Sequence, residues 1–165
     1  MHAAFTPREW ESLFVATLGA AAALAGLLFV ALSINLARIM SFQSLPGRAG
    51  ETIAMLLEAL IVSALVLVPG QSPRTLGIEL LVLGIVGWAV PVRLQLGTRQ
   101  ATDPGRTYLI LRVAYVQAGT LPVVVGAISL IAGGGGGLYW IGLGVLLLFV
   151  ASVWNAWVLL VEILR

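Results

Sequence analysis

Leu13 to Ile34 read LFVATLGAAAALAGLLFVALSI, an apolar run of 22 residues that contains no charge. A helix of this length rises about 33 Å, and the hydrocarbon core of a bilayer is about 30 Å thick. The run follows the stretch Arg8–Glu11, which carries two acids, whereas a secretory signal has a basic start and a shorter apolar region. The sequence therefore predicts a retained transmembrane helix here.

The rest of the chain shares this apolar character. Apolar residues make up 60% of the 165 residues and charged residues 10%. Soluble domains average about 45–50% apolar and about 25% charged residues. A chain of this size cannot bury so much apolar surface in its own core, so we expect the excess to face lipid or partner subunits.

Turn signals divide the remaining chain into four further apolar segments. The separators are Pro46-Gly47, the stretch Pro69–Pro73, the polar stretch Gly97–Thr107 and the glycines Gly133–Gly137, which are expected to form a hinge. We predict an all-α integral membrane bundle of about five transmembrane helices, forming a single domain over residues 1–165. The expected helices span about 12–37, 48–68, 76–94, 108–132 and 138–164. The second and third are short enough to form a re-entrant hairpin instead.

The distribution of arginine predicts the orientation of the bundle. With five spans, seven arginines lie on the side that holds the C-terminus, and two, Arg8 and Arg74, lie on the other side. Because short cytoplasmic loops carry an excess of basic residues, we expect the N-terminus outside and the C-terminus in the cytoplasm. The expected location is the inner membrane of a bacterium, because the use of arginine for every basic residue suggests a GC-rich bacterial genome.

The residue inventory argues against an enzyme. The chain has no cysteine and no lysine, its only histidine is His2, and its only aspartate is Asp103. These absences exclude cysteine nucleophiles, the usual zinc and haem sites, paired-aspartate catalysis and a phosphate-binding loop. No basic run interleaves with aromatic residues, so we expect no nucleic-acid partner. We predict no catalytic, cofactor-binding or metal-binding residues.

Glycines recur seven residues apart in three of the expected helices. Seven residues are close to two helical turns, so each pair lies on one helix face, and small residues let transmembrane helices approach closely. We expect these faces to pack within the bundle, although one of them could be a subunit interface. The pairs are Gly19 with Gly26, Gly77 with Gly84, and Gly119 with Gly126.

Several polar residues fall inside the expected spans. A charge at the bilayer centre costs about 2.5–3.5 kcal/mol on insertion scales, so such residues need partners. Glu58 and Arg112 are expected at similar depths, which makes them natural partners. We predict a polar cluster in the cytoplasmic half of the bundle, formed by Asn35, Glu58, Arg112, Gln117 and Asn155.

This polar cluster has three interpretations that the sequence leaves open. A buried ion pair could fix which helix meets which. Alternatively, Glu58 could titrate while an ion or a proton moves across the membrane. The arginines could also hold a lipid head group.

The first half of the chain resembles a group of small bacterial membrane proteins that are often labelled modulators of the FtsH membrane protease. The resemblance rests on WESLFVATLGAAAALAGLLFVALSINLARIM and on LPGRAGETIAMLLEALIVSALVLVPGQS, and it is looser beyond them. It implies a small multi-pass protein of the bacterial inner membrane and suggests a role in protease regulation. No functional residues carry over from it.

Two functions are compatible with these features. The first is a non-catalytic inner-membrane protein that acts through partners, as an accessory or regulatory subunit, for instance of a membrane protease. The alternative is a homo-oligomeric ion or proton channel, or a small transporter, that uses the polar layer. The expected partners are the lipid bilayer and either further copies of the chain or another membrane protein.

Overall fold

A computed structural model describes residues 3–42, 45–99 and 106–164 of the chain. These residues form helices joined by short turns. Two short 3-10 helices precede six α-helices. The elements are η1 (Ala3–Phe5), η2 (Pro7–Trp10), α1 (Glu11–Ile34), α2 (Leu36–Ser41), α3 (Leu45–Val66), α4 (Pro73–Arg99), α5 (Arg106–Ala132) and α6 (Leu138–Leu164).

Five of these helices are long and apolar enough to cross a membrane, which confirms the predicted fold class of an all-α membrane bundle. α3 has 22 residues and α4 has 27. At 1.5 Å per residue even α3 rises about 33 Å, so the second and third helices have the length of full spans. The protein is therefore a multi-pass membrane protein. Its orientation in the membrane stays a prediction.

Two prolines begin helices where the sequence predicts turns. Pro46 lies in the first turn of α3, and Pro73 is the first residue of α4. Each of these helices therefore begins three residues earlier than expected. Proline is tolerated there because the first N–H groups of a helix have no intrahelical partner. Part of Gly97–Thr107, expected as a loop, is also helical, since α4 ends at Arg99 and α5 begins at Arg106.

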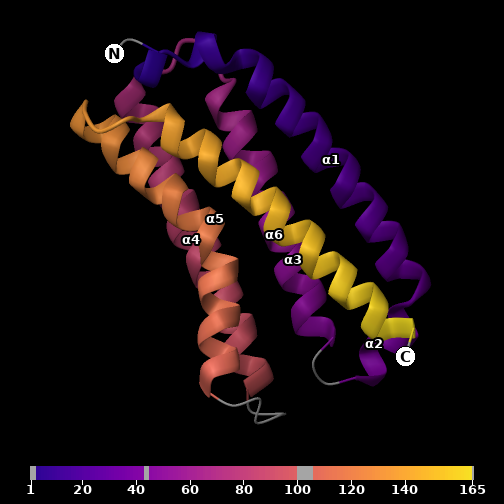
Figure 1. Ribbon diagram of the computed structural model, residues 1–165. Coiled ribbons are helices and arrows are strands. Elements are labelled where there is room, and N and C mark those ends of the chain that lie inside the picture. Colours follow the sequence, from indigo (N-terminus) through magenta and orange to yellow (C-terminus); the bar gives the residue numbers. More distant parts are fainter. Residues whose placement is uncertain (1–2, 43–44, 100–105, 165) are drawn as a thin grey trace.

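The long helices run up and down across the bundle, and α3 lies at its centre (Figure 1). α3 packs against α1, α4 and α6, while α5 packs between α4 and α6. The N-terminus lies at one end, beside the α3–α4 and α5–α6 turns. The C-terminus lies at the other end, beside α2 (Figure 1). α3 touches three other long helices, and four of its polar side chains are buried: Glu51, Thr52, Glu58 and Ser63.

Two of the three predicted glycine faces pack inside the bundle. A Cβ added to Gly77 would lie 2.8 Å from the carbonyl oxygen of Ala127, so α4 and α5 are in backbone contact there. A Cβ on Gly126 would lie 2.5 Å from Cγ1 of Ile141 in α6. Gly84 and Gly119 are equally enclosed, against Val124 of α5 and Leu148 of α6. These glycines allow the close helix approach that the sequence predicts.

The expectation that Gly19 and Gly26 pack within the bundle is wrong for this chain. Nothing lies within 4 Å of a Cβ added at either position. α1 packs against α3 through the opposite side of its helix, which carries Phe14, Thr17 and Ala21. The glycine spacing identified one face of α1 correctly, but that face points out of the bundle.

The glycines between α5 and α6 form an ordered turn, not the hinge expected from their composition. Gly133, Gly135, Gly136 and Gly137 have positive φ angles, which other residues adopt only with strain. The Ser129 hydroxyl anchors the turn, because it donates to the carbonyl of Gly134 and accepts from the N–H of Gly137. The turn therefore holds the ends of α5 and α6 at a fixed spacing.

Candidate functional site

Glu58 lies near the middle of the bundle, where α3, α4 and α5 meet. It is 13 residues from the start of α3 and 8 residues from its end. Its partners, Thr120 and Gly87, also lie near the midpoints of their helices. Glu58 therefore lies slightly beyond the midpoint of α3, and not in the half that contains the start of this helix, where the polar cluster is expected. Which side of the membrane is cytoplasmic stays a prediction.

The carboxyl of Glu58 is almost fully enclosed, with 3% of the residue exposed. Thr120 donates a hydrogen bond from Oγ1 to Oε2 of Glu58, at 2.9 Å. The other oxygen, Oε1, is buried and has no hydrogen-bond partner among the described residues. Buried polar groups in proteins are nearly always hydrogen-bonded, so this oxygen requires an explanation.

Among the side chains that the structure describes, no other Asp, Glu, Lys, Arg or His lies at this depth. The segments 12–37, 59–73, 80–92 and 113–161 contain no Asp, Glu, Lys, Arg or His, so Glu58 is the one acid in the apolar centre of the sequence. The described side chains that contact its carboxyl are neutral. Ionisation of Glu58 in this apolar centre therefore carries a desolvation cost.

Gln117 lies on α5, one helical turn before Thr120, the residue that bonds Glu58. It is 4% exposed, and its Nε2 donates to the carbonyl of Trp88, at 3.2 Å. Trp88 follows Gly87, whose backbone contacts the Glu58 carboxyl, and Gln117 is one helical turn from Thr120. Its Oε1 is a second buried acceptor without a hydrogen-bond partner in the part of the chain that the structure describes.

The predicted pairing of Glu58 with Arg112 stays a prediction, because the side chain of Arg112 lies outside the described residues. Positions 112 and 120 both lie in α5 and are eight residues apart. Eight residues correspond to about 12 Å along a helix axis. The contacts of Glu58 that the structure describes come instead from Thr120 and Gly87.

Asn155 belongs to a second polar group, near the C-terminal end of the bundle between α3 and α6. Its Nδ2 donates to Oγ1 of Thr52 at 2.8 Å and to the carbonyl of Arg48 at 3.3 Å. Arg48 also forms an ion pair with Glu162, with 2.9 Å between Nη1 and Oε1. These bonds join the beginning of α3 to the end of α6, so we assign this group a structural role.

Asn35 is separate from both polar groups. It lies at the junction of α1 and α2, and its Nδ2 donates to the carbonyl of Ala31 in its own helix, at 2.9 Å. This bond is local to the helix end. The single cluster predicted from the sequence is therefore wrong: Gln117 joins Glu58, while Asn155 and Asn35 lie elsewhere.

Thr120 and Gly87 are not among the residues predicted from the sequence. Thr120 lies three residues after Gln117, on the same side of α5, and that spacing could have indicated it. Gly87 follows Gly84 by three residues, but nothing in the sequence says that it meets an acid on another helix. Both residues lie far from Glu58 along the chain, so only the packing of three helices brings them together.

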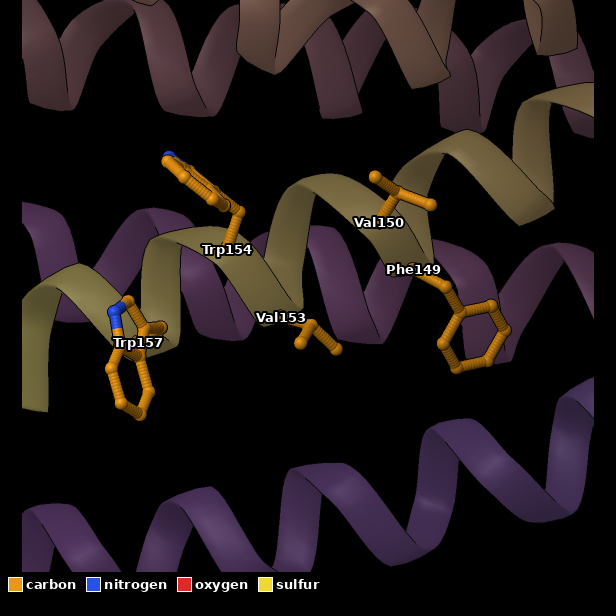
Figure 2. Close-up of a pocket in the computed structure, with 5 residues that line it drawn as sticks. All are labelled: Phe149, Val150, Val153, Trp154 and Trp157. Atoms are coloured by element: carbon orange, nitrogen blue, oxygen red, sulfur yellow. The ribbon is translucent and has the colours of Figure 1, made fainter.

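The described residues hold no group of three or more His, Cys, Asp or Glu side chains that could bind a metal ion. A groove on the outer side of α6 is lined by Phe149, Val150, Val153, Trp154 and Trp157 (Figure 2). These side chains carry no ionisable group, and the groove suits contact with hydrocarbon chains. Glu58 and its neighbours thus remain the candidate site.

Comparison with known protein families, with curated proteins and with solved structures finds no match to this chain. The resemblance to proteins labelled as protease modulators therefore stays a prediction.

Proposed function

We propose that this protein binds and releases an ion at Glu58 as part of ion or proton translocation across the membrane. The observation that carries the proposal is the Oε1 atom of Glu58, buried at mid-bundle without a hydrogen-bond partner among the described residues. Ionisable residues within membrane spans commonly mark ion pathways and proton relays. A purely structural acid would be expected to have both oxygens paired.

An ion pair with a structural role lies elsewhere in the bundle and supports this division of roles. Arg48 and Glu162 are paired at the bundle end and tie α3 to α6. The carboxyl of Glu58 accepts one hydrogen bond from a neutral hydroxyl. Because the span segments around it are otherwise apolar, a continuous water path requires an additional opening, and we propose that it forms between copies of the chain.

Purified protein in liposomes is expected to carry an ion flux that Glu58→Gln reduces to the rate of empty liposomes. Glutamine keeps the size of the side chain and its ability to accept from Thr120, but it cannot exchange an ion. The measurement is dye-reported flux under proton, sodium and potassium gradients.

Glu79→Gln is the matched control for this experiment. Glu79 lies near the start of α4, and one of its oxygens accepts a hydrogen bond from Gln71 at 2.8 Å. The control removes an acid without touching the mid-bundle site, so its flux should equal that of the wild type. The proposal fails if wild-type flux does not exceed that of empty liposomes or if Glu58→Gln leaves it unchanged.

The partner-dependent role expected from the sequence remains the second prediction. It is tested by affinity purification from native membranes in mild detergent, followed by native and peptide mass spectrometry. A stoichiometric foreign protein is the expected result for an accessory subunit. Repeated recovery of this chain alone, after crosslinking, would contradict that role.

A further inference from the structure

The carboxyl of Glu58 is packed against the backbone of α4. A Cβ added to Gly87 would lie 2.5 Å from both Cδ and Oε2 of Glu58, and 2.7 Å from Oε1. Real Cβ atoms do not approach other atoms so closely. The carboxyl therefore occupies the space that a side chain at position 87 would otherwise take, and little room is left on that side for an ion with a coordination shell.

The oxygen groups next to the carboxyl are also too few for a metal cation. The Thr120 hydroxyl already donates to Oε2, and Gln117 adds one amide oxygen. Ca²⁺ takes about six to eight oxygen ligands and Mg²⁺ about six, several of them waters, so either ion needs open space around the carboxyl. A proton needs no coordination shell and no additional space.

Two acceptors without donors lie at this junction, Oε1 of Glu58 and Oε1 of Gln117. The bond from Gln117 Nε2 to the carbonyl of Trp88 fixes which atom of the amide is its free acceptor. If the Glu58 carboxyl is protonated, its O–H group can donate a hydrogen bond. One proton therefore supplies the donor that the site lacks, without introducing a charge into the apolar centre.

The charged side chains that the structure describes on the three surrounding helices lie away from the carboxyl. On α3, Glu51 is buried two turns toward the C-terminal end of the bundle. On α4, Arg93 is exposed and lies six residues beyond Gly87. On α5, the Tyr115 hydroxyl donates to the carbonyl of Ala151, and the side chain of Arg112 lies outside the described residues.

We propose that the species bound at Glu58 is a proton, that Gly87 and the scarcity of ligands exclude metal cations, and that the amide oxygen of Gln117 accepts a hydrogen bond from the protonated carboxyl. This inference rests on the proposed function, which it makes specific to protons. It assigns Glu58 to proton binding, with Thr120 and Gln117 as positioning residues.

Infrared difference spectroscopy of the protein in lipid tests the inference. The carbonyl stretch of a protonated carboxylic acid is expected to appear as the buffer is acidified and to disappear as it is made alkaline. Glu58→Gln should remove this band, while Glu79→Gln should leave it. Added sodium or potassium chloride at constant pH should not change it.

Thr120→Val provides a second variant that retains the acid. Loss of the hydroxyl that donates to Oε2 should shift the frequency of the same band, whereas a band from another acid would not move. The inference is overturned if the band is absent at every pH, if it survives Glu58→Gln, if Thr120→Val leaves its frequency unchanged, or if sodium or potassium removes it. A band that behaves as expected in a protein without flux would instead overturn the proposed function and leave proton binding supported.

Discussion

Replacing Gly126 with alanine is expected to lower the free energy of unfolding by about 1–3 kcal/mol, the usual cost of overpacking a filled site. The added methyl group would lie 2.5 Å from Cγ1 of Ile141 and 2.9 Å from the carbonyl oxygen of Gly137. The Ile141 side chain can rotate, but the Gly137 carbonyl belongs to the anchored α5–α6 turn. Relief of the clash therefore requires α5 and α6 to separate. Reversible unfolding in mixed detergent micelles measures the change.

Gly26→Ala is the matched control, since it makes the same chemical change on α1. Nothing lies within 4 Å of the added methyl group. Alanine is favoured over glycine in a helix interior by about 0.5–1 kcal/mol. The control should therefore be neutral or slightly stabilising, so the two substitutions are expected to have opposite signs. Equal destabilisation by both would contradict the assignment of the α1 glycines to the outside of the bundle.

Gly87→Ala is expected to destabilise the protein strongly, and Glu58→Ala should relieve most of that effect. Alone, the methyl group at position 87 displaces the Glu58 carboxyl, which then loses its bond to Thr120. With alanine at position 58, the same methyl group occupies the vacated space. A double-mutant cycle should give a favourable coupling of about 1–3 kcal/mol, as is typical of residues in contact.

Gly77→Ala combined with Glu58→Ala controls for a general loss of packing. Gly77 contacts the backbone of Ala127 on α5, and it lies ten residues from Gly87 along α4. That separation is about 15 Å along the helix axis, beyond the range in which mutations usually couple. The effects of Gly77→Ala and Glu58→Ala on the free energy of unfolding should therefore be additive. A coupling at position 77 as large as at position 87 would argue against direct contact between Gly87 and Glu58.

The polar residues show how far a sequence can predict a site inside a membrane bundle. Glu58 was identified correctly as a buried acid, because a single acid in an apolar segment is visible in the sequence. The sequence predicts it in the half of the bundle that contains the start of α3, whereas the structure places it slightly beyond the midpoint of that helix. Its partner Thr120 is 62 residues away and lies on another helix. The identity of this partner is decided by how α3, α4 and α5 pack together, which the sequence does not show.

The glycines show the same difference between what the sequence predicts and what helix packing decides. The pairs Gly19 with Gly26 and Gly119 with Gly126 have identical spacing. The first pair is open and the second is enclosed by α6. Spacing specifies that two small residues share one helix face, but it does not specify which helix covers that face. The rotation of α1 about its own axis is decided by Phe14, Thr17 and Ala21 packing on α3.

The sequence by itself determined the membrane class, the number of spanning helices and the presence of one acid in the apolar centre. These features follow from segment length and composition, which act locally along the chain. The tertiary structure alone decided that Glu58 meets Gly87 and Thr120, that Asn155 belongs to a different group, and that the α1 glycines face outward. Those contacts join residues far apart in sequence, so they depend on which helices pack together and on how each helix is rotated about its own axis.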